Sequence, residues 1–129
     1  MPGTFHVEWL PGGVLVQTRS GLLSVEQAEE YVAAVEHAVG SAPSPWGAVI
    51  DTRSAPAQTE DVQAIIQRLI RFVEAKQVKR IAIVATSAVT GIQQRRITTA
   101  PGMHDPSNVS FHHDFDEAVA QVRAALAGS

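Results

Sequence analysis

Residues Trp46–Gln77 read WGAVIDTRSAPAQTEDVQAIIQRLIRFVEAKQ, and this segment carries the clearest structural pattern in the chain. An apolar run, Ala48 to Ile50, ends at Asp51 and is followed by a loop of mostly small residues, Thr52–Gln58. Short apolar runs bounded by turn-forming residues are typical of buried strands. The pattern therefore predicts a buried strand with a tight connection at its carboxyl end.

The second half of this segment predicts an amphipathic helix. Thr59 is expected to cap its start, because threonine is a favoured N-cap and the acids Glu60 and Asp61 suit the positive end of a helix dipole. Apolar residues then recur at spacings of three and four along one helix face. They are Val62, Ile65, Ile66, Leu69, Ile70 and Val73. A strand, a loop and a helix of this kind form half of a βαβ unit.

Composition and charge narrow the class of protein. The chain has 129 residues, of which 45% are hydrophobic and 18% charged, values that suit one folded domain spanning residues 1–129. A formal net charge of -3 gives no electrostatic reason to expect a nucleic acid or an anionic membrane as partner. The chain has no cysteine, which excludes disulfides and thiolate metal sites. We find no signal-peptide pattern and no apolar run near the roughly 20 residues of a membrane span, so a cytoplasmic protein is expected.

The residues before this segment predict a β-hairpin followed by a helix. Residues 5–9 and 14–18 alternate apolar and polar side chains on either side of the turn sequence Pro11-Gly12-Gly13. Ser24 and Gln27 have the spacing of a capping box, and Gly40 is expected to end the helix. The apolar stripe expected on this helix consists of Val25, Ala28, Val32, Val35 and Val39.

The residues after it predict two more strands and two more helices. Residues 80–85 are nearly all apolar, as in strands buried on both faces of a parallel sheet, and residues 109–112 form a short last strand. Between them we expect a short helix over 87–99 and a loop over 100–108. The final helix begins at the capping pattern Asp114–Glu117. Its apolar positions are Ala118, Val119, Val122, Ala125 and Leu126.

The predicted element order is β-β-α-β-α-β-α-β-α. Strands that alternate with helices form parallel sheets through right-handed crossovers, and the opening hairpin adds an antiparallel strand. The fold class is therefore α/β, with a single mixed, mainly parallel sheet, an N-terminal antiparallel hairpin and flanking helices.

The chain resembles the STAS and SpoIIAA-like superfamily, whose fold is that of bacterial anti-sigma-factor antagonists. The resemblance covers nearly the whole chain and rests on the element order and on Val49-Ile50-Asp51 before a long helix. The strand Arg80–Val84 and the closing Val109-Ser110-Phe111 then Glu117-Ala118 pattern add to it. It implies a non-catalytic regulatory or protein-interaction domain of bacterial type.

The phosphorylation motif of that family is altered in this chain. The family carries an Asp-Ser-Ser-Gly-Leu-type segment at the start of its second helix, and a partner kinase phosphorylates its serine. Laid without gaps from Asp51, that segment falls on residues 59–62, where Glu60 and Asp61 replace the phosphoacceptor serine. Ser54 and Thr59 are the only hydroxyls close enough to substitute. We therefore predict that the domain is not switched by phosphorylation at this position.

Candidate binding residues follow from the place of the loops, because ligands of open parallel sheets collect beyond the carboxyl ends of the strands. Three strand ends are rich in polar groups, at residues 51–54, 86–87 and 112–114. Capping of loops and helices is the competing explanation for Asp51, Ser87 and Asp114. A solvated helix face competes likewise for the polar patch at residues 93–96. The candidate ligand- or partner-binding residues are Asp51, Arg53, Ser54, Thr59, Ser87, Arg95 and Arg96.

The residue pattern favours neither hydrolase chemistry nor a metal site. A hydrolase triad could be assembled by residue type from Ser87, His112 and Asp51, but the G-x-S-x-G motif that positions the serine nucleophile is absent. A metal site would draw on His104, His112 and His113 with nearby aspartates, Asp105 or Asp114. Adjacent strand residues point to opposite faces, so His112 and His113 would not easily share one ion. We predict no enzyme, no metal site and no cofactor.

Two functions from different classes remain. The first is contact with another protein, or with a second copy of the chain as a homodimer, through the loop and helix start Arg53–Asp61, with the helix expected over 87–99 next to it. The alternative is a small apolar or anionic ligand, or a lipid, held between the sheet and the helices. Related α/β folds resembling the CRAL-TRIO lipid-binding domains hold apolar ligands in that place, and such pockets are mostly apolar with few polar groups.

Overall fold

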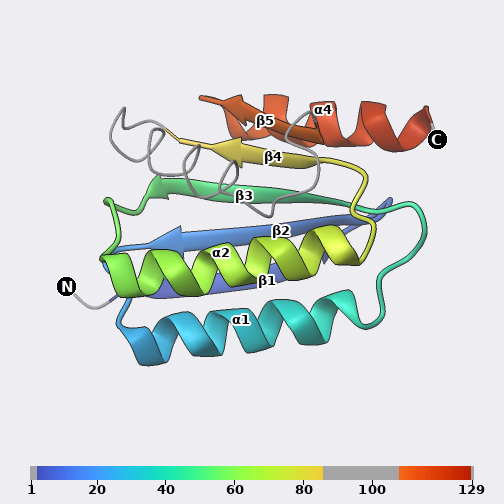
Figure 1. Ribbon diagram of the computed structural model, residues 1–129. Helices are drawn as coiled ribbons and strands as arrows, with labels where there is room; N and C mark the ends of the chain where they lie inside the picture. The colour runs from blue at the N-terminus through green and yellow to red at the C-terminus, as the bar shows by residue number, and fades with distance from the viewer. Residues whose placement is uncertain (1–2, 86–107, 129) are drawn as a thin grey trace.

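The computed structural model describes residues 3–85 and 108–128, and its described strands form one five-stranded sheet of order β1-β2-β3-β4-β5 (Figure 1). β1 and β2 pair antiparallel, and every other neighbouring pair is parallel. This arrangement confirms the predicted α/β class. The elements in chain order are β1 (Thr4–Leu10), β2 (Val14–Ser20), α1 (Val25–Val39), β3 (Gly47–Ser54), α2 (Glu60–Ala75), β4 (Ile81–Val84), β5 (Val109–His112) and α4 (Phe115–Ala127).

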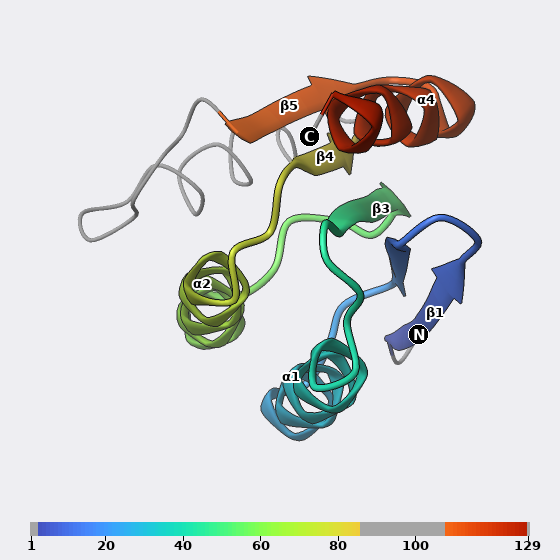
Figure 2. The ribbon, with the colours of Figure 1, turned by 90° about the vertical axis from the view of Figure 1, so that its right-hand side faces the viewer.

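Helices cover both faces of the sheet. α1 and α2 lie on one face and α4 on the other (Figure 2). Side chains of a strand alternate between faces, so Leu15 packs beneath α1 and α2 while its neighbours Val14 and Val16 pack beneath α4. Two apolar cores result, one on each side of the sheet. β4 lies between them and is buried along its whole length, as its apolar sequence predicts.

The hairpin and the first helix follow the sequence closely. Gly12 and Gly13 take φ values of 92° and 86°, a left-handed conformation that glycine adopts without strain. Ser24 accepts a hydrogen bond from the Gln27 backbone at 3.1 Å and its own N–H donates to the Gln27 side chain at 2.9 Å, which confirms the capping box. One prediction is wrong: Val25, placed in the buried stripe, is 46% exposed.

β3 is longer than predicted, because the strand continues through residues 52–54 where we expected a loop. Two interactions extend it. Past an irregularity in the β2–β3 register, Ser20 pairs with Ser54, and the Thr52 hydroxyl donates to the Val84 carbonyl at 2.8 Å. Asp51 and Arg53 therefore stand on a strand and share one of its faces.

α2 confirms the predicted stripe and corrects its cap. All six predicted apolar residues of this helix are buried. Thr59 occupies the N-cap position with extended backbone, but its side chain makes no capping hydrogen bond. The expectation that the Thr59 hydroxyl caps the helix is therefore wrong.

The C-terminal part packs tightly against β3. A Cβ atom on Gly47 would lie 2.4 Å from Val122 Cγ1, so only glycine lets α4 approach this closely. Asp114 caps α4 by accepting from the Asp116 backbone at 3.1 Å. The predicted helix over 87–99 and the loop that follows it up to residue 107 lie outside the described residues. In the part of the chain that is described, no helix is long and apolar enough to cross a membrane.

Candidate binding surface at the carboxyl ends of the strands

The carboxyl ends of β2 and β3 and the first turns of α1 and α2 gather at one end of the sheet (Figure 1). Parallel strands connected by helices place these parts together, and this edge is where α/β sheets bind ligands. The backbone joins the two strand ends directly, since the Gly21 N–H donates to the Ser54 carbonyl at 3.0 Å.

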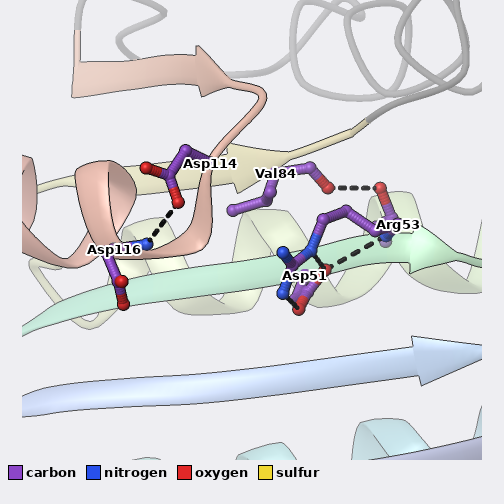
Figure 3. A network of polar contacts seen from close by, with 6 residues as sticks. Asp51, Arg53, Val84, Asp114 and Asp116 are labelled. Atoms are coloured by element: carbon purple, nitrogen blue, oxygen red, sulfur yellow. Dashed lines mark hydrogen bonds and ion pairs between the residues drawn. The ribbon is translucent and has the colours of Figure 1, made fainter.

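Asp51 and Arg53 form a bidentate ion pair on β3 (Figure 3). One carboxylate oxygen accepts from Arg53 Nε at 3.0 Å and from its backbone N–H at 3.1 Å, while the other accepts from Nη2 at 2.8 Å. The guanidinium also lies over the Phe115 ring, 5.6 Å from its centroid. Two parallel N–H···O bonds of this kind fix the orientation of an arginine as well as its charge.

The electrostatics of this pair are balanced within the protein. Burial alone would raise the pKa of Asp51, but the hydrogen bonds and the charge of Arg53 outweigh it and hold that pKa below its ordinary value. The hydrogen bond to Asp51 raises the pKa of Arg53, and the charges of Asp114 and Asp116 add to this increase. Both groups of the pair are therefore ionised at neutral pH. Because 40% of its side chain is exposed, Arg53 still reaches the surface.

Gln58 locks the β3–α2 loop onto the end of β2. Its side chain is buried, with the amide nitrogen donating to the Gly21 carbonyl at 3.2 Å and the Pro56 carbonyl at 2.9 Å. Its amide oxygen accepts from the Leu23 backbone at 2.9 Å. One buried amide thus satisfies three backbone groups of two neighbouring loops, and it holds both in a single conformation.

An exposed apolar pair lies beside this anchored loop. Leu22 is 45% and Val25 46% exposed, and they are the large hydrophobic residues that stand out to solvent among the described residues. Leu23 between them is buried and held by Gln58. We call Leu22 and Val25 the apolar patch. Exposed acidic residues of the α1 and α2 starts accompany it: Glu26, Glu60 and Asp61.

Sequence reasoning missed this patch. Val25 fits the spacing of the buried stripe, and Leu22 is next to Leu23 in an apolar pair of the same type. The signal that could have identified Val25 is its place in the first turn after Ser24. Side chains of the first turn often lie past the end of the packed core and are exposed to solvent.

Of the predicted site residues, four lie at this end of the sheet. Asp51 and Arg53 form the ion pair, whereas Ser54 at the end of β3 and Thr59 at the N-cap of α2 are exposed on either side of the loop that Gln58 anchors. The other three predicted residues, Ser87, Arg95 and Arg96, lie outside the described residues.

The two adjacent histidines make separate local contacts. His112 lies within hydrogen-bonding distance of Ser110 Oγ at 2.8 Å and of Glu117 at 3.2 Å, while His113 Nδ1 lies 3.1 Å from the Ala85 carbonyl. The carboxylate of Asp51 is engaged by Arg53, so these two groups of the hypothetical triad have different partners. Among residues 3–85 and 108–128, no group of three metal-ligating side chains is placed to hold an ion.

A second set of polar groups, which sequence reasoning did not single out, lies inside the core beneath α1. Gln17 and Arg19 of β2 and Tyr31 of α1 are each 1% exposed. The Tyr31 hydroxyl donates to the Gln17 amide oxygen, and the Arg19 guanidinium lies 5.6 Å from the centroid of the Tyr31 ring. Among the described residues, none accepts a hydrogen bond from the three guanidinium nitrogens of Arg19.

Such an arginine is energetically expensive. Burial lowers the pKa of Arg19, an effect that its interaction with the Tyr31 phenol partly opposes, yet an arginine stays protonated at neutral pH. Moving an ion from water into a protein interior costs several kcal/mol, and an ion pair or hydrogen bonds normally offset that cost. The ring of Tyr31 supplies only a cation–π contact, worth about 2 kcal/mol when desolvated.

A groove of about 670 Å³ lies at the opposite end of the sheet. It is lined by the hairpin turn, the α1–β3 connection and the end of α4, including Arg123 and Leu126. Arg123 is tied to the hairpin there, donating to the Pro11 carbonyl at 3.3 Å. This groove is far along the strands from the loops that bind ligands in α/β sheets.

Comparison with known proteins shows the fold. No protein-family model matches the chain, and no curated protein matches it. Among solved structures, it is similar to an uncharacterized protein of the DUF3478 family with a SpoIIAA-like fold from Shewanella loihica PV-4, with a TM-score of 0.68 and 19% identity over 93% of each chain. It is also similar to an anti-sigma factor antagonist from Mycobacterium paratuberculosis, with a TM-score of 0.63 and 21% identity over 94% of each chain. The chain therefore has the SpoIIAA-like, or STAS-like, fold that its sequence predicts.

Proposed function

We propose that this protein is a non-catalytic regulatory domain that binds a protein partner through the apolar patch and the loop anchored by Gln58. The observation that carries the proposal is the exposure of Leu22 and Val25 beside a loop whose conformation is fixed in advance. A preformed surface loses little conformational entropy on binding, which favours recognition without rearrangement. The fold likeness to an anti-sigma factor antagonist supports the regulatory class.

The charges around the patch indicate the chemistry of the partner. Glu26, Glu60 and Asp61 are exposed, and the nearby Arg53 is already neutralised by Asp51. An apolar centre with an acidic border suits a surface that offers apolar side chains bordered by lysine or arginine. Either another protein or a second copy of the chain could present such a surface.

We propose that phosphorylation does not switch partner binding by this domain. Thr59 is exposed and its hydroxyl makes no capping bond, but Glu60 and Asp61 follow it immediately and would repel a phosphate. We expect binding at this surface to be constitutive. Phosphate found on Thr59 or Ser54 in protein isolated from its native cells would contradict this expectation.

A photo-crosslinking experiment tests the proposed surface. A benzophenone amino acid placed at Leu22 should yield a covalent product in native cell extract, and mass spectrometry of that product identifies the partner. The matched control carries the same group at Ala124, an exposed position on α4 on the other face of the sheet. A product consisting of two copies of the chain would identify the partner as a second copy.

Charge reversal provides the discriminating step. With the crosslinker at Leu22, the double substitution Glu60→Lys and Asp61→Lys should lower the yield of the product by about ten-fold, because it reverses the acidic border. The same product from Leu22 and Ala124, or an unchanged yield after charge reversal, would exclude this surface.

A further inference from the structure

We propose that Arg19 anchors an internal binding site for the carboxylate of a small monocarboxylic acid with an apolar body. The site is distinct from the exposed surface described above, and it does not depend on that surface binding a protein.

The position of Arg19 defines the walls of the site. Arg19 stands on β2 directly opposite Phe5 of β1, and its guanidinium lies over the Tyr31 ring of α1. The rings of Phe5 and Tyr31 pack together with 5.6 Å between their centroids. The guanidinium is therefore enclosed between the sheet and α1, beside the aromatic rings of the apolar core on that face.

Within the described residues, no carboxylate pairs with Arg19. Its strand neighbour on the same face, Gln17, uses its amide oxygen to accept from Tyr31. The carboxylates that form ion pairs are committed elsewhere. These pairs are Asp51–Arg53, Glu29–Arg68, Glu8–His6 and Glu117–His112. In the described part of the chain, all three nitrogens of the guanidinium remain without an acceptor.

An anion satisfies this group better than water does. A guanidinium presents five N–H donors in a planar fork, which matches the two oxygens of a carboxylate. Water can accept the hydrogen bonds but leaves the positive charge uncompensated, whereas a carboxylate does both. A low-dielectric surrounding strengthens this attraction.

The charge balance favours a monoanion over phosphate. Arg19 contributes one positive charge, and the nearest polar groups, Gln17 and Tyr31, are neutral. A doubly charged phosphate would therefore bring a second, unpaired charge into the core, where it is costly. The surrounding rings and aliphatic groups then suit an aliphatic or aromatic body on the acid.

The burial of Arg19 makes the exchange of this ligand slow. With the side chain 1% exposed, an acid can enter or leave only when the structure opens locally. An acid acquired during expression should therefore remain bound through purification. Native mass spectrometry should show an added mass that disappears on denaturation, and small-molecule analysis of the released fraction should identify a monocarboxylic acid.

The binding experiment uses defined probes. The protein is unfolded in denaturant, freed of small molecules and refolded, and then titrated with octanoate, benzoate, acetate and inorganic phosphate by calorimetry and thermal unfolding. Octanoate or benzoate should bind with one site per chain and raise Tm, while phosphate should have no saturable effect.

Variants assign the binding to Arg19. Arg19→Met keeps the length of the side chain without its charge and should weaken binding of the acid by at least about ten-fold, since a charge-assisted hydrogen bond is lost. Arg123→Met on α4 is the control and should bind as the unaltered protein does. Arg19→Lys retains the positive charge without the planar guanidinium. If Arg19→Met does not fold, Arg19→Lys serves as the test of weakened binding.

Three results would each overturn the proposal. The first is that no acid is retained and no carboxylate binds saturably. The second is that Arg19→Met binds octanoate or benzoate within two-fold of the unaltered protein, and the third is that phosphate alone binds saturably. None of these results bears on the crosslinking at Leu22, so the two proposals fail separately.

Discussion

Arg53 and Arg19 stand near the carboxyl ends of adjacent strands, but they differ in every respect that governs a charge. Arg53 points to the α4 face, is partly exposed and makes two hydrogen bonds to Asp51 from its guanidinium. Arg19 points to the face covered by α1, is fully buried and has no acceptor among residues 3–85 and 108–128. The exposed arginine is thus satisfied by the chain, while the one that most needs a counter-ion lacks it.

The difference arises from the neighbours of each arginine along its own strand. Residues two apart on a strand share a face, so the side chain at position i−2 is a candidate partner beside those on the neighbouring strands. For Arg53 that residue is Asp51, a carboxylate. For Arg19 it is Gln17, whose oxygen is already used by Tyr31, and the residue two positions on is Gly21, which has no side chain. The residue at position i−2 therefore distinguishes the two arginines: Asp51 pairs with Arg53, whereas Gln17 leaves Arg19 free to bind a ligand.

The largest expected effect concerns the apolar core in which Arg19 is embedded. Ile66 is 1% exposed on the buried face of α2, and Ile66→Ala should lower the free energy of unfolding by roughly 2–5 kcal/mol because it leaves a cavity. Urea unfolding followed by circular dichroism measures this change. A loss below about 1 kcal/mol would mean that this face is not the tightly packed side of the sheet.

The next effect has the opposite sign. In ligand-free protein, Arg19→Met should leave the free energy of unfolding unchanged or raise it by up to about 4 kcal/mol, because it removes a buried charge without opening a large cavity. The measurement is urea unfolding of refolded protein in a buffer without carboxylates. Destabilisation by more than about 2 kcal/mol would show that the free protein already supplies an acceptor for Arg19.

A smaller effect is expected for the paired arginine. Asp51→Asn should cost about 1 kcal/mol at neutral pH, a value kept low because Arg53 is partly exposed to solvent. The folded-state pKa of Asp51 is depressed, so its contribution is fully present above the ordinary aspartate pKa of about 3.9 and is lost as the pH falls through the folded-state value. The difference in unfolding free energy between the two proteins should therefore shrink only in acid. A difference that persists unchanged well below that range would exclude the ion pair as its source.

The smallest effect is expected at the start of α2. Thr59 is exposed and its hydroxyl makes no capping bond, so Thr59→Ala should change the free energy of unfolding by less than about 0.5 kcal/mol. Sequence reasoning alone predicts about 1 kcal/mol for the loss of a threonine N-cap. Urea unfolding under the conditions used for Ile66→Ala measures this change. A loss of unfolding free energy near the larger value would indicate that the Thr59 hydroxyl caps the helix after all.

Much of the fold could be predicted because its signals are local and repeated. The α2 stripe, the apolar run of β4 and the Ser24 capping box each depend on residues within one element, and all three are confirmed. The errors occur where distant segments decide the outcome. β3 extends to Ser54 because β2 pairs with it there and because Thr52 bonds to β4, neither of which is visible in residues 46–58 alone.

The candidate site was predicted only in part for the same reason. The carboxyl end of β3 was correctly placed at the sheet edge, and the adjacency of Asp51 and Arg53 can be read along the strand. The burial of Arg19 could not be predicted from the sequence, because residues 14–18 alternate as in a half-exposed strand. β2 is instead an interior strand with helices on both faces, so its polar positions are buried as well.

The hydrogen bonds of Gln58 have a consequence for the timescale on which this end of the molecule opens. The Leu23 amide lies between a strand and a helix, where backbone N–H groups usually exchange with solvent within minutes or less. Here that N–H is donated to a buried side chain that also holds Gly21 and Pro56. Its deuterium exchange should therefore follow the sub-global opening of the β2–β3 pairing and not the fluctuation of a loop, and this amide would report how often the structure around the buried Arg19 opens.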